Sequence, residues 1–145
     1  MSRSNRTEPT ARLMIAALRR FEGSLQHKLH RDGFEDVSVA LTNILRHLDR
    51  DGMRLQALAA DARVTKQAAS QAVRALEERG LVQVEPDPDD GRAKRVVYTG
   101  RGRRLIDRAT RHVATMERDW SRRLGAEAYQ SLRRALQRLA ADEDA

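Results

Sequence analysis

The fold of this chain is decided by residues 55–99, whose sequence is LQALAADARVTKQAASQAVRALEERGLVQVEPDPDDGRAKRVVYT. The first part of this stretch holds two amphipathic patterns separated by a short turn at 62–65. Apolar side chains that recur three or four residues apart predict a helix. They are Leu55, Leu58 and Ala59 in the first pattern, and Ala69, Val73 and Leu76 in the second. Thr65 can cap the second helix and Gly80 can end it, so we predict two consecutive helices, the second over 66–79.

The second part of the stretch favours β-structure. Valines lie on both sides of the turn-rich segment 86–91, at Val82, Val84, Val96 and Val97. The prolines and glycine of that segment prevent a helix from continuing, so two short strands joined by a loop are predicted. Thr99 is placed to cap a further helix. Two helices, a hairpin and another helix predict a winged helix-turn-helix, within a mainly α fold that has a small β-hairpin wing.

The outward face of the helix over 66–79 has the chemistry of a DNA contact. If Ala69, Val73 and Leu76 face the core, the helical period turns a polar set outward: Lys66, Gln67, Ser70, Gln71 and Arg74. This face carries no carboxylate, and its amides and cations suit bases and phosphates in a major groove. Thr65 and the helix N-terminus offer further donors to a phosphate. An ordinary solvated face is the alternative, and the basic hairpin that follows favours DNA.

The hairpin loop carries a cation suited to a minor groove. A narrow minor groove has enhanced negative potential, which attracts an arginine at a hairpin tip such as Arg92. Lys94 and Arg95 follow on the next strand and could contact phosphates. Alternatively, these cations form a surface cluster that offsets the nearby aspartates.

Two more helices are predicted before this stretch. The first spans 7–31, is capped by Thr7 and is entered through Glu8 and Pro9, which suit a first helical turn. The second ends before the turn signal at 51–52. Their apolar positions are Leu13, Ala17, Leu18, Phe21, Leu25 and Leu29 in the first, and Val37, Leu41, Ile44, Leu45 and Leu48 in the second.

Residues 100–140 predict two helices divided at 124–125. Their apolar positions are Leu105, Ala109, Val113, Met116 and Trp120, followed by Leu132, Ala135, Leu136 and Leu139. These stripes, with that of 7–31, exceed what a small DNA-binding lobe needs. We therefore predict that 7–31 and 100–140 are dimerisation helices around a lobe at 36–99, and that 1–145 is one protomer of a homodimer.

Composition limits the class of protein. The 145 residues carry a formal charge of +7, which favours a polyanionic partner, although residues 53–99 hold only 8 basic against 7 acidic side chains. Cysteine is absent, which excludes disulfides, thiolate zinc sites and thiol redox chemistry. There is no apolar run long enough for a membrane span, and the polar N-terminus lacks the apolar core of a signal peptide. A cytoplasmic protein that does not bind a membrane is expected.

These residues resemble the MarR family of bacterial winged-helix regulators. The matching runs are 55–59, 64–71, 76–82, 86–95 and 98–102, within a stretch that spans about a third of the chain. The wing pattern Asp90-x-Arg92, followed by Thr99-x-x-Gly102, is specific in combination. The flanking helices match by position and amphipathic character rather than by motif.

The resemblance implies a homodimer that represses, or less often activates, genes by binding a pseudo-palindromic operator in double-stranded DNA. It implies that the second helix of the motif enters the major groove, that Arg92 enters the minor groove, and that Asp90 helps to fix the wing. The positions that match base and phosphate contacts are Gln67, Ala68, Ser70 and Gln71. The family often has a Ser-Thr pair and a later Arg where this chain has Gln67-Ala68 and Gln71.

Other classes of function make different predictions. A nucleic-acid-binding or architectural protein without a sequence preference would bind every duplex with similar affinity. A winged-helix module that binds proteins would have no affinity for DNA. Paired carboxylates, a nucleophile with its base and a metal cluster are all missing from the sequence, so an enzyme is not expected and no cofactor is predicted.

The resemblance also implies a small aromatic effector, since family members often bind aromatic acids or phenols. Residue types that suit such a pocket are Phe34, His47, Met116 and Trp120, although packing in a core or dimer is the alternative for Trp120. His27 and His30 have the spacing of a shared metal site on one helix. No third ligand stands nearby, so exposed histidines without a metal are the expectation.

Overall fold

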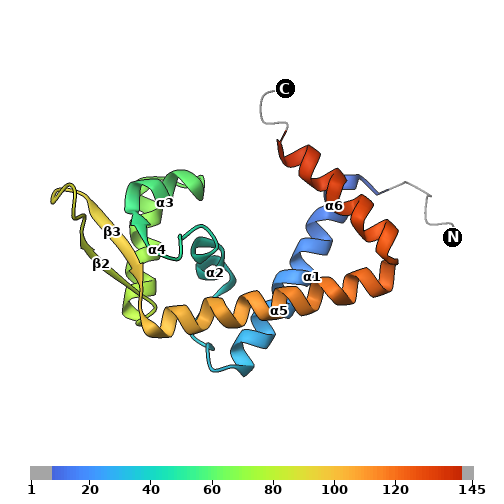
Figure 1. Cartoon of the computed structure of the whole chain (residues 1–145), viewed down its shortest axis with the longest axis horizontal. Coiled ribbons are helices and arrows are strands. Elements are labelled where there is room, and N and C mark those ends of the chain that lie inside the picture. Colours follow the sequence, from blue (N-terminus) through green and yellow to red (C-terminus); the bar gives the residue numbers. More distant parts are fainter. Residues whose placement is uncertain (1–7, 142–145) are drawn as a thin grey trace, which may run out of the picture. The chain divides into compact units, whose positions relative to one another are not determined.

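The computed structural model describes residues 8–141, which form six helices and three strands (Figure 1). In chain order they are α1 (Thr10–Arg31), α2 (Val39–Leu45), β1 (Met53–Arg54), α3 (Leu55–Asp61), α4 (Lys66–Glu78), β2 (Val82–Pro86), β3 (Lys94–Tyr98), α5 (Gly100–Leu124) and α6 (Ala126–Ala141). The chain divides into two compact units, one up to Ala109 and the other from Thr110. The predicted mainly α winged-helix fold is confirmed.

A three-stranded antiparallel sheet forms one side of the winged-helix lobe. Its order is β1-β3-β2, with Val84 opposite Val96 and Met53 opposite Val96 on the other edge. The hairpin of β2 and β3 was predicted, whereas β1 was not, because two residues are too few to show an alternating pattern. The loop between β2 and β3 projects beyond α3 and α4 as the wing (Figure 1).

The core of the lobe lies where α4 packs against α2, α3 and β2. Its fully buried apolar side chains include Leu58, Ala69, Leu76, Leu81 and Val96. Tyr98 joins the sheet to the end of α2, because its buried hydroxyl donates to the carbonyl oxygens of Leu45 at 2.9 Å and Leu48 at 3.3 Å. Burial raises the pKa of this phenol to about 12.

Two predicted helices are shorter than expected. The first helix begins at Thr10 with Pro9 as its N-cap, so Glu8 and Pro9 precede it rather than form its first turn. Thr7, the predicted cap, lies outside the described residues. The second helix is only Val39–Leu45, because the Ser38 hydroxyl accepts from Leu41 N and fixes its start there. Val37 and Leu48, predicted as helical, are buried on either side of it.

The second unit contains the end of α5 and all of α6. Gly125 has a φ of +86°, a left-handed conformation that suits glycine and separates the two helices as predicted. Arg133 of α6 donates to Glu117 of α5 at 3.2 Å. Between residues 8 and 141, none of the helices combines the length and apolarity needed to span a bilayer.

Candidate nucleic-acid interface

The exposed face of α4 has the composition that the sequence predicts. The Thr65 hydroxyl accepts from Ala68 N at 3.0 Å and caps the helix, while Ala69, Val73 and Leu76 are buried. The opposite face is accordingly turned to solvent: Lys66, Gln67, Ala68, Gln71 and Arg74 are exposed and Ser70 is half-buried. The first acidic residue of α4 is Glu77, so its first three turns offer a polyanion no repulsive charge.

The turn before α4 places Arg63 in a conformation that glycine normally occupies. Its φ is +53°, which costs a residue with a side chain roughly 1–2 kcal/mol. Val64 N donates to Ala59 O and Arg63 N to Ala60 O, both at 3.1 Å, so this residue closes the C-terminus of α3. The tight turn sets α4 directly after α3.

The wing is a short, internally bonded loop between the ends of β2 and β3. Asp90 accepts from Arg92 N at 3.0 Å, and Ala93 N donates to the Asp90 carbonyl at 2.9 Å. This backbone leaves the Arg92 side chain exposed. Asp90 thus lies where it fixes the backbone that carries Arg92.

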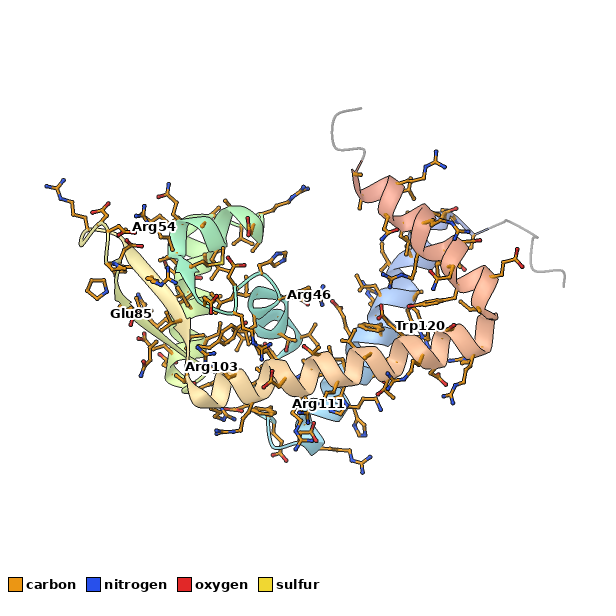
Figure 2. The ribbon with its side chains drawn as sticks, in the orientation of Figure 1. Arg46, Arg54, Glu85, Arg103, Arg111 and Trp120 are labelled. Carbon is orange, nitrogen blue, oxygen red and sulfur yellow. The ribbon has the colours of Figure 1, made fainter. Side chains whose placement is uncertain are left out.

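Asp87 is a member of the site that the sequence analysis did not single out. Its carboxylate accepts from Arg54 Nε at 2.9 Å and from Arg54 Nη2 at 3.2 Å. It also accepts from Asp89 N at 2.9 Å and Asp90 N at 3.1 Å. Hydrogen bonds from Arg54 and then from the backbone lower the pKa of Asp87 to about 2. Arg54, beside the wing in Figure 2, therefore ties β1 to the wing loop.

A cleft of about 530 Å³ separates α4 from the wing. Four predicted DNA-binding residues line it: Ser70, Arg74, Arg92 and Lys94. Glu77 and Glu85 also line it, the latter on β2 in Figure 2. The structure thus brings the cations of α4 and of the wing to the same side of the lobe.

Arg95 is not among the residues that line this cleft. Successive residues of a strand point to opposite faces, so Arg95 faces away from its neighbour Lys94. Its guanidinium donates to the carbonyl oxygens of Asp51 and Gly52, in the turn before β1. Of the two cations on β3 that could contact phosphates, Lys94 therefore lies in the cleft, whereas Arg95 binds the backbone at the edge of the sheet.

The four residues suggested for an effector pocket lie in both units. Phe34 is buried, with the Arg101 guanidinium 5.3 Å from the centre of its ring, and His47 is exposed just after α2. In the second unit, Met116 is buried and Trp120 is half-buried, both on α5.

The two histidines of α1 have different surroundings. His27 is exposed, whereas His30 Nε2 lies 2.7 Å from the Gln26 amide nitrogen. Within the described part of the chain, no three side chains of His, Asp or Glu are grouped as a metal site would require.

A short helix, a tight turn, a capped helix with an acid-free face and an arginine-tipped wing define a winged helix-turn-helix protein. Comparison with known proteins supports the winged helix-turn-helix fold. The model of the MarR family matches residues 36–93, from the turn before α2 to the end of the wing loop, so this part of the chain is similar to the MarR family. No curated protein matches the sequence.

Solved structures of the same fold cover nearly the whole chain. The transcriptional repressor CouR bound to a 23-mer DNA duplex has a TM-score of 0.78 at 23% identity, over 97% of this chain and 98% of that one. A crystal structure of MarR has a TM-score of 0.74 at 25% identity, over 96% and 93%. CouR from Rhodococcus jostii RHA1 bound to p-coumaroyl-CoA has a TM-score of 0.69 at 24% identity, over 94% and 95%.

Proposed function

We propose that this protein is a sequence-specific transcriptional regulator that binds a pseudo-palindromic operator in double-stranded DNA as a homodimer. The observation that carries the proposal is the exposed face of the first three turns of α4, which presents cations and amides without a carboxylate, next to the exposed Arg92 of the wing. A major groove accepts a helix of this kind, and amide side chains can pair with adenine through two hydrogen bonds. MarR-family regulators in general are DNA-binding proteins rather than enzymes.

The side chains divide into those that contact bases and those that contact phosphates. Gln67, Ser70 and Gln71 are suited to base edges, because amides and hydroxyls both donate and accept. Lys66, Arg74 and Lys94 supply cations for phosphates, as does the capped N-terminus of α4 with Thr65, while Ala68 leaves room for close approach. Arg92 enters the minor groove, whose potential attracts it without a base code. Asp90 and Asp87 hold the wing loop in place.

Exposed apolar side chains support the homodimer. On α1, Leu13, Met14, Ile15 and Leu18 are 43–52% exposed. On α6, Leu132, Leu136 and Leu139 are 37–64% exposed. Several large apolar side chains exposed on one helix are costly in water and favour burial in an interface. A two-fold dimer would place its recognition helices in successive major grooves, roughly 34–36 Å apart.

Repression and release by a small aromatic ligand complete the proposal. The similar CouR is a transcriptional repressor and has been solved with p-coumaroyl-CoA, an aromatic thioester. An effector needs a coupling of only about 1–3 kcal/mol between its site and DNA to act as a switch. Trp120 is the only tryptophan, so its fluorescence monitors binding of aromatic acids near Met116 and α5. If no acid of such a panel quenches the fluorescence and none releases DNA, the effector is removed from the proposal.

The experiment that tests the central proposal is selection of bound duplexes from a genomic library. We expect a few enriched sites that share an inverted repeat, and protection of that repeat in a footprint. Enrichment of unrelated sequences with equal affinity would instead favour an architectural protein. That second candidate draws support from the charge distribution, because residues 100–145 contain 11 basic against 7 acidic side chains.

A further inference from the structure

Two arginines and one carboxylate meet at the C-terminal end of α4. Arg101 donates to both carboxylate oxygens of Asp36, at 2.8 and 3.2 Å, and to the Arg79 carbonyl at 2.6 Å. Arg79 in turn donates to the Asp36 carbonyl at 2.6 Å and to Ala75 O at 2.8 Å. Together with Phe34, under the Arg101 guanidinium, these residues form what we call the α4 clamp.

The clamp joins three segments that are distant in sequence. Asp36 lies in the turn between α1 and α2, Arg79 directly follows α4, and Arg101 is in the first turn of α5. A guanidinium suits this junction because its planar fork reaches a carboxylate and a carbonyl at once, which an ammonium group cannot do in the same geometry. The hydrogen bonds from Arg101 lower the pKa of Asp36, so this carboxylate is ionised at neutral pH.

The α4 clamp lies where a small change in the angle of α4 displaces the proposed DNA-contacting residues. The 13 residues of α4 make a helix about 20 Å long, and the clamp holds the end opposite to Gln67. A tilt of about 5° at the clamp therefore moves the first turn by roughly 1.5 Å. Such a movement is enough to break a bidentate hydrogen bond to a base. Contacts with phosphates tolerate it better, because they depend on charge more than on angle.

We infer that Arg101 and Asp36 are positioning residues that set the angle of α4 on DNA and so determine base specificity without contacting DNA. The inference rests on the function proposed above. The alternative role of Arg101 is that of one more positive charge near a polyanion. The two roles predict different effects of removing the negative charge of Asp36. If the role is electrostatic, binding to every duplex becomes stronger. If the role is positioning, the protein discriminates less between its operator and other sequences.

The test compares affinity for the selected duplex with affinity for a scrambled duplex of equal length and composition. The variants are Arg101→Lys, which keeps the charge but loses the fork, and Asp36→Asn, which keeps the shape but loses the charge. We expect the specific-to-scrambled ratio to fall about 5- to 50-fold in each, while the slope of log affinity against log salt is unchanged. The double variant is expected to lose no more than the worse single variant, because both changes break one interaction.

Matched controls lie next to each clamp residue. Arg104→Gln removes a charge from the same part of α5, and Glu35→Gln removes one beside Asp36; both residues are exposed. Neither control is expected to change the ratio. Circular dichroism and a thermal melt establish whether each variant is folded. If Arg101→Lys is unfolded, the affinity ratio of Asp36→Asn is compared with that of Glu35→Gln, and this comparison alone tests the positioning role.

The results separate this inference from the proposed function. A wild-type protein that does not discriminate between the duplexes would refute the proposed function itself. A discriminating wild type whose ratio survives in folded Arg101→Lys and Asp36→Asn would refute the positioning role alone. Tighter binding of Asp36→Asn to both duplexes, with an unchanged ratio, would assign the clamp residues a purely electrostatic role and overturn the inference.

Discussion

Replacement of Gly102 by alanine is expected to destabilise the winged-helix lobe, although alanine is the better helix former. Gly102 lies in the first turn of α5, directly against the segment that follows α4. A β-carbon there would lie 2.0 Å from Leu81 O, 3.0 Å from Leu81 C and 2.9 Å from Tyr98 Cδ1. Two of these three atoms belong to the backbone, so rotation of a side chain cannot relieve the overlap.

The magnitude follows from what must move. Leu81 O has to retreat by more than about 1 Å to reach ordinary contact distance. This oxygen accepts from Thr99 N at 3.1 Å, so the movement also weakens that hydrogen bond. Strain of about 1–3 kcal/mol and a hydrogen bond of about 0.5–1.5 kcal/mol oppose a helix-propensity gain of at most about 1 kcal/mol. We expect a net loss of about 2 kcal/mol, or roughly 4–8 °C in Tm.

The assay is urea unfolding followed by circular dichroism, at one protein concentration for all variants because the proposed dimer would make stability depend on concentration. Gly100→Ala is the matched control, since the atom nearest to its added β-carbon is a flexible Arg104 nitrogen at 3.7 Å. It is expected to change stability by less than about 0.5 kcal/mol. If Gly102→Ala is as stable as the wild type, α5 does not approach Leu81 as closely as the structure indicates, and the steric reasoning is wrong.

Three further predictions concern the interface. Arg92→Ala is expected to weaken operator binding by roughly 1–3 kcal/mol with the fold intact; an unchanged affinity in a gel shift would remove the wing from the mechanism. Gln71→Ala is expected to change the preferred bases in a duplex selection, whereas Lys66→Ala weakens all sequences alike and lowers the salt slope by about 1. Identical selected motifs for wild type and Gln71→Ala would refute base contact there. Because hydrogen bonds from Arg54 and from the backbone of Asp89 and Asp90 lower the pKa of Asp87 from 3.8 to about 2, the ionised carboxylate stabilises the lobe above about pH 4, and this stabilisation disappears as the pH falls towards 2. Urea midpoints should therefore separate wild type from Asp87→Asn at pH 7 and converge near pH 2; a constant separation would contradict the pairing.

The local features of the lobe could be predicted because each depends on residues close in sequence. The cap at Thr65 and the end of the helix at Gly80 are determined within a few residues, and the structure has both where expected. The boundaries of α2 were wrong because Val37 and Leu48 are buried for tertiary reasons, and burial alone imitates a longer helical stripe. The two residues of β1 form a strand because they pair with β3, and their own sequence has no alternating pattern that would predict it.

The roles of individual charges depended on partners far away in the chain. Three aspartates share the wing loop, and only the fold shows that Asp87 is the one that pairs with Arg54, 33 residues earlier. Lys94 and Arg95 are adjacent and equally basic, yet the pleat of β3 sends them to opposite sides. The type of residue at Phe34 suggested a pocket, and only the fold shows that the Arg101 guanidinium lies over its ring.

The sequence by itself determined that α4 has an apolar face and, over its first three turns, an outward face without acidic residues, because the helical period places residues three or four apart on one side. It likewise determined the position of the wing, because proline and glycine act on the backbone next to them. The tertiary structure alone decided which carboxylate anchors the wing, which cations share the cleft, and why a glycine stands at position 102. Those features are contacts between segments that only folding brings together, and spacing along a chain carries no information about which distant atoms will meet.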